Sequence, residues 1–95
     1  MIRSWANAAT RRFANEGKIS KFRGLDAEAA QELLAVLDAA SSLADLSPLK
    51  SVRLHKLKGD RKGQWAMTVN GPWRICFRFE DGDAHDVEIV NYHKG

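Results

Sequence analysis

Imidazole, cationic and phenol side chains gather in the second half of the sequence. They are His55, Lys56, Lys58, Arg61, Lys62, Arg74, Arg78, Tyr92 and His93. Metal-free RNA cleavage uses such a set, because a base takes the proton of the ribose 2′-hydroxyl, cations stabilise the charge on the phosphate, and an acid protonates the departing 5′-oxygen. Histidine suits the proton transfers, arginine matches phosphate oxygens, and tyrosine stacks on unpaired bases. The set therefore indicates an RNA-cleaving site or, more simply, a solvated basic face with surface histidines.

Charge along the sequence forms four alternating blocks. Residues 1–24 and 50–78 are basic, and the second of these blocks carries eight Lys/Arg and one Asp. Residues 25–49 carry five acids and no Lys or Arg, and residues 79–95 are also acidic. This pattern predicts one cationic face, which concentrates phosphates or an acidic protein partner. The simpler alternative is that the charges are spread around the surface and only keep the protein in solution.

Several other kinds of site lack a motif in this sequence. It contains no P-loop, dinucleotide-binding glycine motif, GxSxG or HExxH pattern. The acids of "EDGD" at 80–83 suit a hairpin turn better than a metal site. The single cysteine, Cys76, excludes an intrachain disulfide, and we expect it to pack as a small residue in a sheet. No apolar run approaches a membrane span. We therefore expect no metal, no cofactor and no membrane association, in a cytoplasmic protein.

The elements that must position the reactive side chains follow from the spacing of apolar residues. Helical spacing over 6–16 ends at Gly17, and helical spacing over 27–44 begins after the N-cap residue Asp26. Beyond Pro48 the period changes to two, and it predicts strands at 53–58, 64–70, 73–80 and 86–92, with turns at 70–73 and 80–83. "MIRSW" at the start predicts a further short strand, with Ile2 pointing inward.

This order of elements predicts an α+β fold in a single domain spanning residues 1–95. The helices should cover the aromatic face of the sheet, formed by Trp73, Ile75, Phe77 and Phe79. Since neighbouring residues of a strand point to opposite faces, Arg74 and Arg78 should lie on the other face.

Four motifs follow one another along the chain: "LHKLKGD" at 54–60, "GQW" at 63–65, "WRI" at 73–75 and "NYH" at 91–93. In this order they resemble the HigB branch of the RelE-like bacterial toxins, also called the plasmid maintenance killer family. The resemblance implies a RelE-like fold, with a short N-terminal strand and two helices packed on a twisted, mainly antiparallel sheet. It also implies the toxin of a type II toxin–antitoxin system, a ribosome-dependent mRNA endonuclease that inhibits translation. We expect the cleavage to be independent of metal, because the sequence has no credible metal ligands and its cationic side chains can replace an ion.

The resemblance implies partners and site residues as well. The partners would be a HigA-type helix-turn-helix antitoxin, the ribosome with its mRNA, and operator DNA through the antitoxin complex only. The matching motifs assign catalytic roles to His55, Lys58, Arg74, Tyr92 and His93, and to Asn91, where the family usually has an acid. Lys56, Arg61, Lys62 and, on strand phase, Arg78 would bind RNA or the ribosome.

Asn91 keeps two alternatives open beside an active nuclease, because asparagine cannot accept a proton at neutral pH. One is a catalytically decayed module of the same fold that binds RNA or an antitoxin partner without cleavage. The other is a transcriptional partner that only binds an antitoxin.

Overall fold

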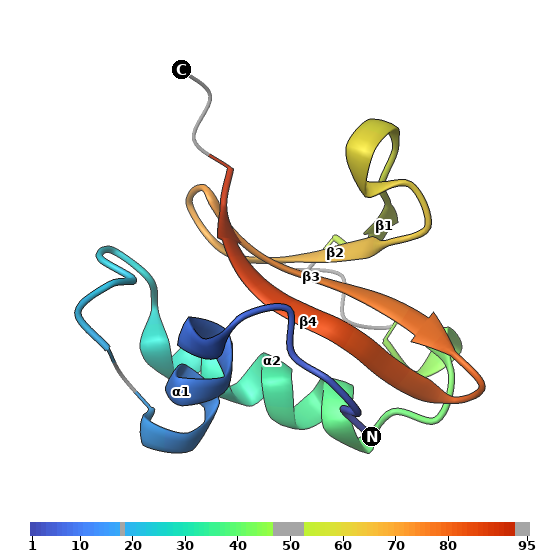
Figure 1. Ribbon diagram of the computed structural model, residues 1–95, viewed down its shortest axis with the longest axis horizontal. Coiled ribbons are helices and arrows are strands. Elements are labelled where there is room, and N and C mark those ends of the chain that lie inside the picture. The colour runs from blue at the N-terminus through green and yellow to red at the C-terminus, as the bar shows by residue number, and fades with distance from the viewer. Residues whose placement is uncertain (18, 47–52, 93–95) are drawn as a thin grey trace.

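The computed structural model describes residues 1–17, 19–46 and 53–92, and it places two helices before a four-stranded sheet (Figure 1). The elements are α1 (Ala8–Glu16), α2 (Ala27–Ala39), η1 (Leu43–Asp45), β1 (His55–Lys56), η3 (Gly59–Arg61), β2 (Trp65–Asn70), β3 (Trp73–Glu80) and β4 (Asp83–Asn91). The strands lie in the order β1-β2-β3-β4, and each pair of neighbours is antiparallel. The predicted α+β fold is confirmed, and so are the turns after Asn70 and Glu80.

The predicted helix over 27–44 is too long. Helix α2 ends at Ala39 because Ala40 has extended backbone angles (φ −70°, ψ 135°). Beyond it, a carboxylate oxygen of Asp45 accepts a hydrogen bond from the amide of Ser41 at 2.9 Å and organises the short turn η1. Short polar side chains compete in this way with helical hydrogen bonds, so apolar spacing alone placed the end of the helix wrongly.

The strand predicted over 53–58 is much shorter in the structure, where β1 contains only His55 and Lys56. Arg53 has a positive φ of 49°, which is not an extended conformation and so ends the strand on that side. On the other side the chain turns into the loop that contains η3. Pro48, the expected helix stop, lies outside the described residues.

The first residues of the chain run beside β4 (Figure 1). Ile2 pairs with Ala84 and Trp5 with Val87, both in the parallel sense, so the predicted N-terminal strand consists of two isolated bridges. Ile2 packs partly buried against the core, as expected. The carboxylate of Asp83, at the start of β4, forms two ion pairs. Its oxygens lie 3.3 Å from the N-terminal amine and 3.1 Å from Nε of Arg3. These contacts hold the start of the chain against the final strand.

Helix α1 is fixed to the same strand by a buried hydrogen bond. The amide of Ile89 donates to the hydroxyl of Thr10 at 3.1 Å, and Thr10 is 0% exposed. A buried hydroxyl is costly unless it is hydrogen-bonded, so this bond specifies how α1 sits on the sheet.

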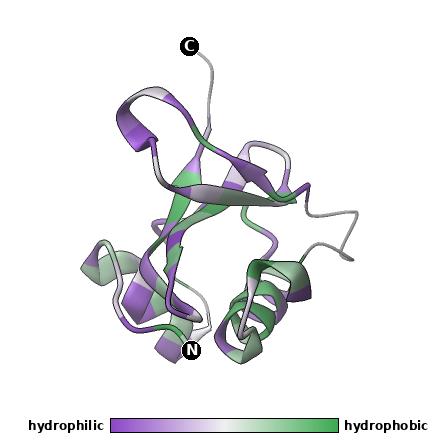
Figure 2. Ribbon diagram, turned by 90° about the vertical axis from the view of Figure 1, so that its right-hand side faces the viewer, coloured by the Kyte–Doolittle hydropathy of each residue, from purple (hydrophilic) through white to green (hydrophobic). Residues whose placement is uncertain are grey.

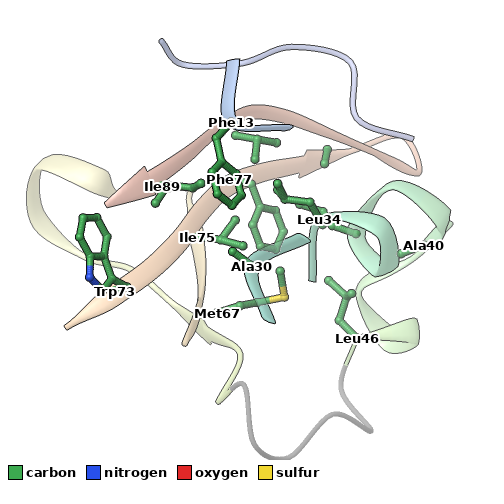
Figure 3. Close-up of a cluster of buried hydrophobic side chains, with 13 residues drawn as sticks. Phe13, Ala30, Leu34, Ala40, Leu46, Met67, Trp73, Ile75, Phe77 and Ile89 are labelled. Atoms are coloured by element: carbon green, nitrogen blue, oxygen red, sulfur yellow. The ribbon is translucent and has the colours of Figure 1, made fainter. Parts of the chain in front are cut away.

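Both helices lie below the strands in the view of Figure 1, and Figure 2, turned by 90°, shows the hydrophobic residues of α2 in green. Between them and the strands lies a hydrophobic core, shown in Figure 3, that includes Phe13, Ala30, Leu34, Leu37, Met67, Trp73, Ile75, Phe77 and Ile89. The side chains of β3 alternate as predicted, with Ile75 and Phe77 fully buried in this core. The core therefore occupies one face of the sheet, and the helices do not cover the other face.

Candidate active site

The face of the sheet that the helices leave uncovered, here called the open face, takes alternate residues from each strand. Cys76 in the middle of β3 pairs with Ala66 of β2 and with Glu88 of β4, and Ala66 pairs in turn with His55. Directly paired residues project to the same side of a sheet. His55, Cys76 and Glu88 therefore share the open face, and Arg74 lies on it two residues before Cys76.

Tyr92, which follows β4, folds back over this face. Its hydroxyl lies 3.6 Å from the sulfur of Cys76, and its amide donates to the carbonyl of Pro72 at 2.7 Å. The guanidinium carbon of Arg74 lies 5.8 Å from the centre of the tyrosine ring, within cation–π range. The structure thus brings together Arg74 and Tyr92, two side chains that the sequence motifs assign to catalysis.

The guanidinium group of Arg74 is held in place by the chain beneath it. One of its terminal nitrogens donates to the carbonyl of Gly71 at 2.7 Å and to that of Trp73 at 3.0 Å. Both acceptors are uncharged, so the positive charge of Arg74 is not neutralised by them. A fixed, uncompensated cation of this kind is suited to binding a phosphate.

The environment of Tyr92 keeps its phenol protonated. Burial and then the hydrogen bond with Cys76 raise the pKa of Tyr92 to about 12. Burial likewise raises the pKa of the Cys76 thiol, although contacts with Tyr92 and Arg61 oppose this change. At neutral pH both groups therefore carry their protons, and Tyr92 is equipped to donate a hydrogen bond rather than to act as a base.

His55 projects from β1 and is exposed. Its Nδ1 lies 2.9 Å from the carbonyl oxygen of Arg53, and a carbonyl only accepts hydrogen bonds, so Nδ1 carries the proton. In the neutral ring Nε2 then holds the free lone pair. His55 is thereby presented as a proton acceptor.

Three lysines gather at the end of β1 and in the loop that follows it. Lys56 pairs with Trp65, which pairs with Phe77 of the core, so Lys56 lies on the opposite side of β1 from His55. Lys56, Lys58 and Lys62 line a pocket of about 370 Å³ together with Leu57 and Gly59. Within the described part of the chain, none of the three lysines has an ion-pair partner. Their charges are therefore available to an anionic ligand.

Arg61 and Arg78, the two arginines predicted to contact RNA, each form an ion pair within the protein. A terminal nitrogen of Arg61 lies 3.1 Å from a carboxylate oxygen of Glu88, and Nε of Arg78 lies 3.5 Å from Asp86. Burial lowers the pKa of Arg61, but the hydrogen bond and charge of Glu88 together raise it by more, so its net shift is upward. Motif matching missed Glu88, although strand alternation opposite Val87 and Ile89 would have placed it on the open face.

The two remaining predicted residues lie at the end of the chain. Asn91 is the exposed last residue of β4, and its partner in the register is Trp73 of the core. It therefore lies on the opposite side of the strand from Glu88 and is not brought to the open face. His93 lies outside the described residues.

Two further expectations concern ligands and membranes. Across residues 1–17, 19–46 and 53–92, no three His, Cys, Asp or Glu side chains gather as metal ligands would. Over the same residues, no helix is long and apolar enough to cross a membrane.

Comparison with known proteins places this chain in a family. Residues 3–93 match the family described as RelE-like toxin of type II toxin-antitoxin system HigB. A protein of Proteus vulgaris named endoribonuclease HigB is 33% identical over 93 residues, which cover 98% of this chain and 100% of that protein. A crystal structure of a histidine-to-glutamine mutant of YafQ from E. coli shares the fold, with a TM-score of 0.62 at 16% identity over 96% of this chain and 93% of that one. The chain belongs to the HigB family of RelE-like toxins of type II toxin–antitoxin systems.

Proposed function

We propose that this toxin cleaves messenger RNA in the ribosome, and that the open face of its sheet is the active site. Endoribonuclease activity accords with the family and with the name of the Proteus vulgaris relative. The observation that carries the choice of site is the position of Arg74 against the protonated phenol of Tyr92. Arg74 is a fixed cation that has no carboxylate partner in the described part of the chain. His55 lies on the same face, and the loop after β1 carries Lys58 and Lys62, which have no ion-pair partner among the described residues.

In the proposed reaction the ribose 2′-oxygen attacks the adjacent phosphorus, and the bond from phosphorus to the 5′-oxygen breaks. Nε2 of His55 takes the proton of the 2′-hydroxyl, while Arg74 and Lys58 stabilise the charge on the phosphate. Tyr92 donates a hydrogen bond and offers its ring to a base. His93, assigned by its motif, protonates the departing oxygen. The products are a 2′,3′-cyclic phosphate and a 5′-hydroxyl.

We propose that the reaction needs no metal bound to the toxin, since the cationic side chains supply the charge that an ion would supply. The test strips the toxin with EDTA, removes the chelator, and adds the toxin to translating ribosomes at fixed free Mg²⁺. Cleavage should match that of untreated toxin. A loss of cleavage that a transition metal restores would contradict the proposal.

Membership of the family gives this toxin an antitoxin partner. We propose that the partner is a HigA-type helix-turn-helix protein, that operator DNA is bound only through their complex, and that the toxin acts in the cytoplasm, where ribosomes translate. Inducing the toxin alone in bacteria and mapping the 5′ ends of messages should reveal new ends, and co-expressing its proposed HigA-type partner should remove them. New ends that persist with that partner would argue against it.

Catalytic decay is the alternative, and Asn91 is the feature that favours it. The register directs Asn91 away from the open face, so the missing carboxylate removes no group from the arrangement of Arg74 and Tyr92. The induction experiment separates the two functions, because a decayed toxin would give no new 5′ ends.

A further inference from the structure

We propose that Arg61 and Glu88 form a positioning pair, which holds the loop of residues 57–64 over the open face so that Lys58 is fixed beside the scissile phosphate. This role rests on the proposed function, since it presumes that RNA is cleaved on this face. The proposal gives a role to Arg61, which the sequence analysis expected to bind RNA, and to Glu88, which belongs to none of the family motifs.

The loop is a closed unit rather than a slack connection. The amide of Leu57 donates to the carbonyl of Gln64 at 2.8 Å and closes the loop at its base. Inside it, the amide of Lys62 donates to the carbonyl of Gly59 at 3.0 Å, and the amide of Gln64 donates to that of Arg61, also at 3.0 Å. A loop bonded in this way moves as one piece, so its position over the sheet depends on contacts beyond its base.

Arg61 supplies such a contact. One terminal nitrogen donates both to the side-chain oxygen of Gln64, at 3.1 Å, and to the carboxylate of Glu88, at 3.1 Å. Arg61 thus joins the loop to the middle of β4. A second contact lies next to it: a β-carbon on Gly63 would come within 3.0 Å of a terminal nitrogen of Arg78, so this part of the loop lies directly against that arginine.

The Arg61–Glu88 pair is more shielded from water than an ordinary surface pair. Its side chains are 32% and 26% exposed, whereas those of the Arg12–Glu16 pair on α1 are 67% and 51% exposed. Shielding from solvent strengthens an ion pair and makes the loss of either partner more costly.

The charge of Glu88 also argues for positioning. A carboxylate on a face that binds RNA repels phosphates unless a cation neutralises it. With Arg61 bound to it, Glu88 adds no net charge to the open face. The carboxylate of Glu88 would be unfavourable for RNA binding by itself, and its presence on this face is explained by its holding Arg61.

Two variants distinguish a positioning pair from a direct RNA contact, because the charges they leave behind have opposite signs. Glu88→Gln frees the cation of Arg61, whereas Arg61→Gln leaves the carboxylate of Glu88 unpaired. If the pair positions the loop, both variants lower kcat, by about 10- to 100-fold as expected for a misplaced catalytic group. KM should rise only in Arg61→Gln. If Arg61 contacts RNA directly, Glu88→Gln should instead be as active as the native toxin, or more active.

The experiment measures kcat and KM for mRNA cleavage on programmed ribosomes, and hydrogen exchange of the backbone amides in the full-length toxin. We expect Glu88→Gln to speed exchange at residues 57–64 severalfold and to leave β3 and β4 unchanged. Glu16→Gln, which breaks the exposed pair on α1, is the matched control and should change neither exchange in the loop nor kcat. The charge exchange Arg61→Glu with Glu88→Arg should restore slow exchange and part of kcat.

Exchange and cleavage together separate failure of this proposal from failure of the proposed function. An active native toxin whose Glu88→Gln variant keeps its kcat, or keeps slow exchange in the loop, overturns the positioning pair. A kcat that falls in Glu88→Gln and is not restored by the charge exchange also overturns it, and indicates that Glu88 touches the substrate. A native toxin that does not cleave RNA, but whose loop loosens in Glu88→Gln, overturns the proposed function alone.

Discussion

Replacing Tyr92 with Phe removes one hydroxyl from the middle of the open face and leaves the ring in place. The pKa of that hydroxyl is about 12, so only about one molecule in 10⁵ would carry the phenolate at pH 7. As a hydrogen-bond donor to the reacting phosphate, by contrast, Tyr92 is fully populated. We therefore expect Tyr92→Phe to lower cleavage by about 10- to 100-fold and to leave the shape of the pH profile between about pH 6 and 9 unchanged.

The folding cost of this change should be small. The contact of the hydroxyl with Cys76 is a long 3.6 Å bond to sulfur, and such a neutral contact contributes no more than about 1 kcal/mol. The ring remains beside the guanidinium group of Arg74. Matched melting temperatures would then assign a loss of cleavage to chemistry. Tyr92→Ala, which also removes the ring, should cost about 1–3 kcal/mol more in binding if a base stacks there.

The pKa itself can be measured directly, because Tyr92 is the single tyrosine of the sequence. The near-ultraviolet absorbance change that accompanies phenolate formation therefore reports this residue alone. Cys76→Ala should lower the pKa of Tyr92, since the thiol raises it. The ordinary pKa of 10.0 lies below the value in the folded protein, so the protonated phenol stabilises the fold below pH 10. That stabilisation is lost as the pH rises towards 12, and Tyr92→Phe should remove this loss.

Two results would refute this reasoning about Tyr92. One is a phenol that titrates at or below its ordinary pKa in the native protein. The other is a native cleavage rate that climbs tenfold per pH unit to pH 9 and disappears in Tyr92→Phe, as it would for a tyrosinate base. An unchanged cleavage rate in Tyr92→Phe would remove the hydroxyl from the mechanism and leave at most the ring.

Substitutions at three other residues test the remaining structure. Arg74→Ala should lower cleavage by about 10²–10³-fold, and Arg74→Lys should not restore it, because an ammonium group lacks the planar fork of a guanidinium. The measurement is single-turnover cleavage by variants with matched melting temperatures. Full activity of either variant would contradict the role assigned to Arg74. Asn91→Asp should keep the cleavage rate, since Asn91 lies off the open face; a large gain on ribosomes would instead indicate a decayed toxin. Thr10→Val should cost about 1–3 kcal/mol in urea unfolding, because it leaves the buried amide of Ile89 unpaired, and a smaller cost would show that α1 is held mainly by packing.

The parts of the fold that were predicted correctly are those with a long local signal. Strand β3 alternates over eight residues, and the structure confirms that Ile75 and Phe77 are buried while Arg74 lies on the other face. Cys76 is buried in the sheet, as expected. The end of α2 and the shortness of β1 were predicted wrongly, because they depend on side-chain hydrogen bonds and on a positive φ at Arg53, which apolar spacing does not encode.

In the candidate site, too, the residues with a local sequence signal were predicted and those without one were not. Strand alternation and the motifs identified Arg74 and Tyr92, whose meeting needs only that neighbouring strands pair. The partner of Arg61 is 27 residues away in the sequence, and it becomes a neighbour only when the loop folds back over the sheet. No local pattern marks such a contact, so the sequence analysis did not include Glu88 in the site.

The contacts of the first residues with β4 bear on when the toxin folds during its synthesis. Ile2 and Trp5 pair with β4, and Thr10 accepts a hydrogen bond from Ile89, so these contacts cannot form until β4 has been synthesised. Contacts this distant in sequence form late, because the intervening chain must be closed first. Tyr92 follows the same strand, and the open face is incomplete without it. The open face, which is the active site on the proposed function, is therefore assembled only after β4 and Tyr92 have been synthesised.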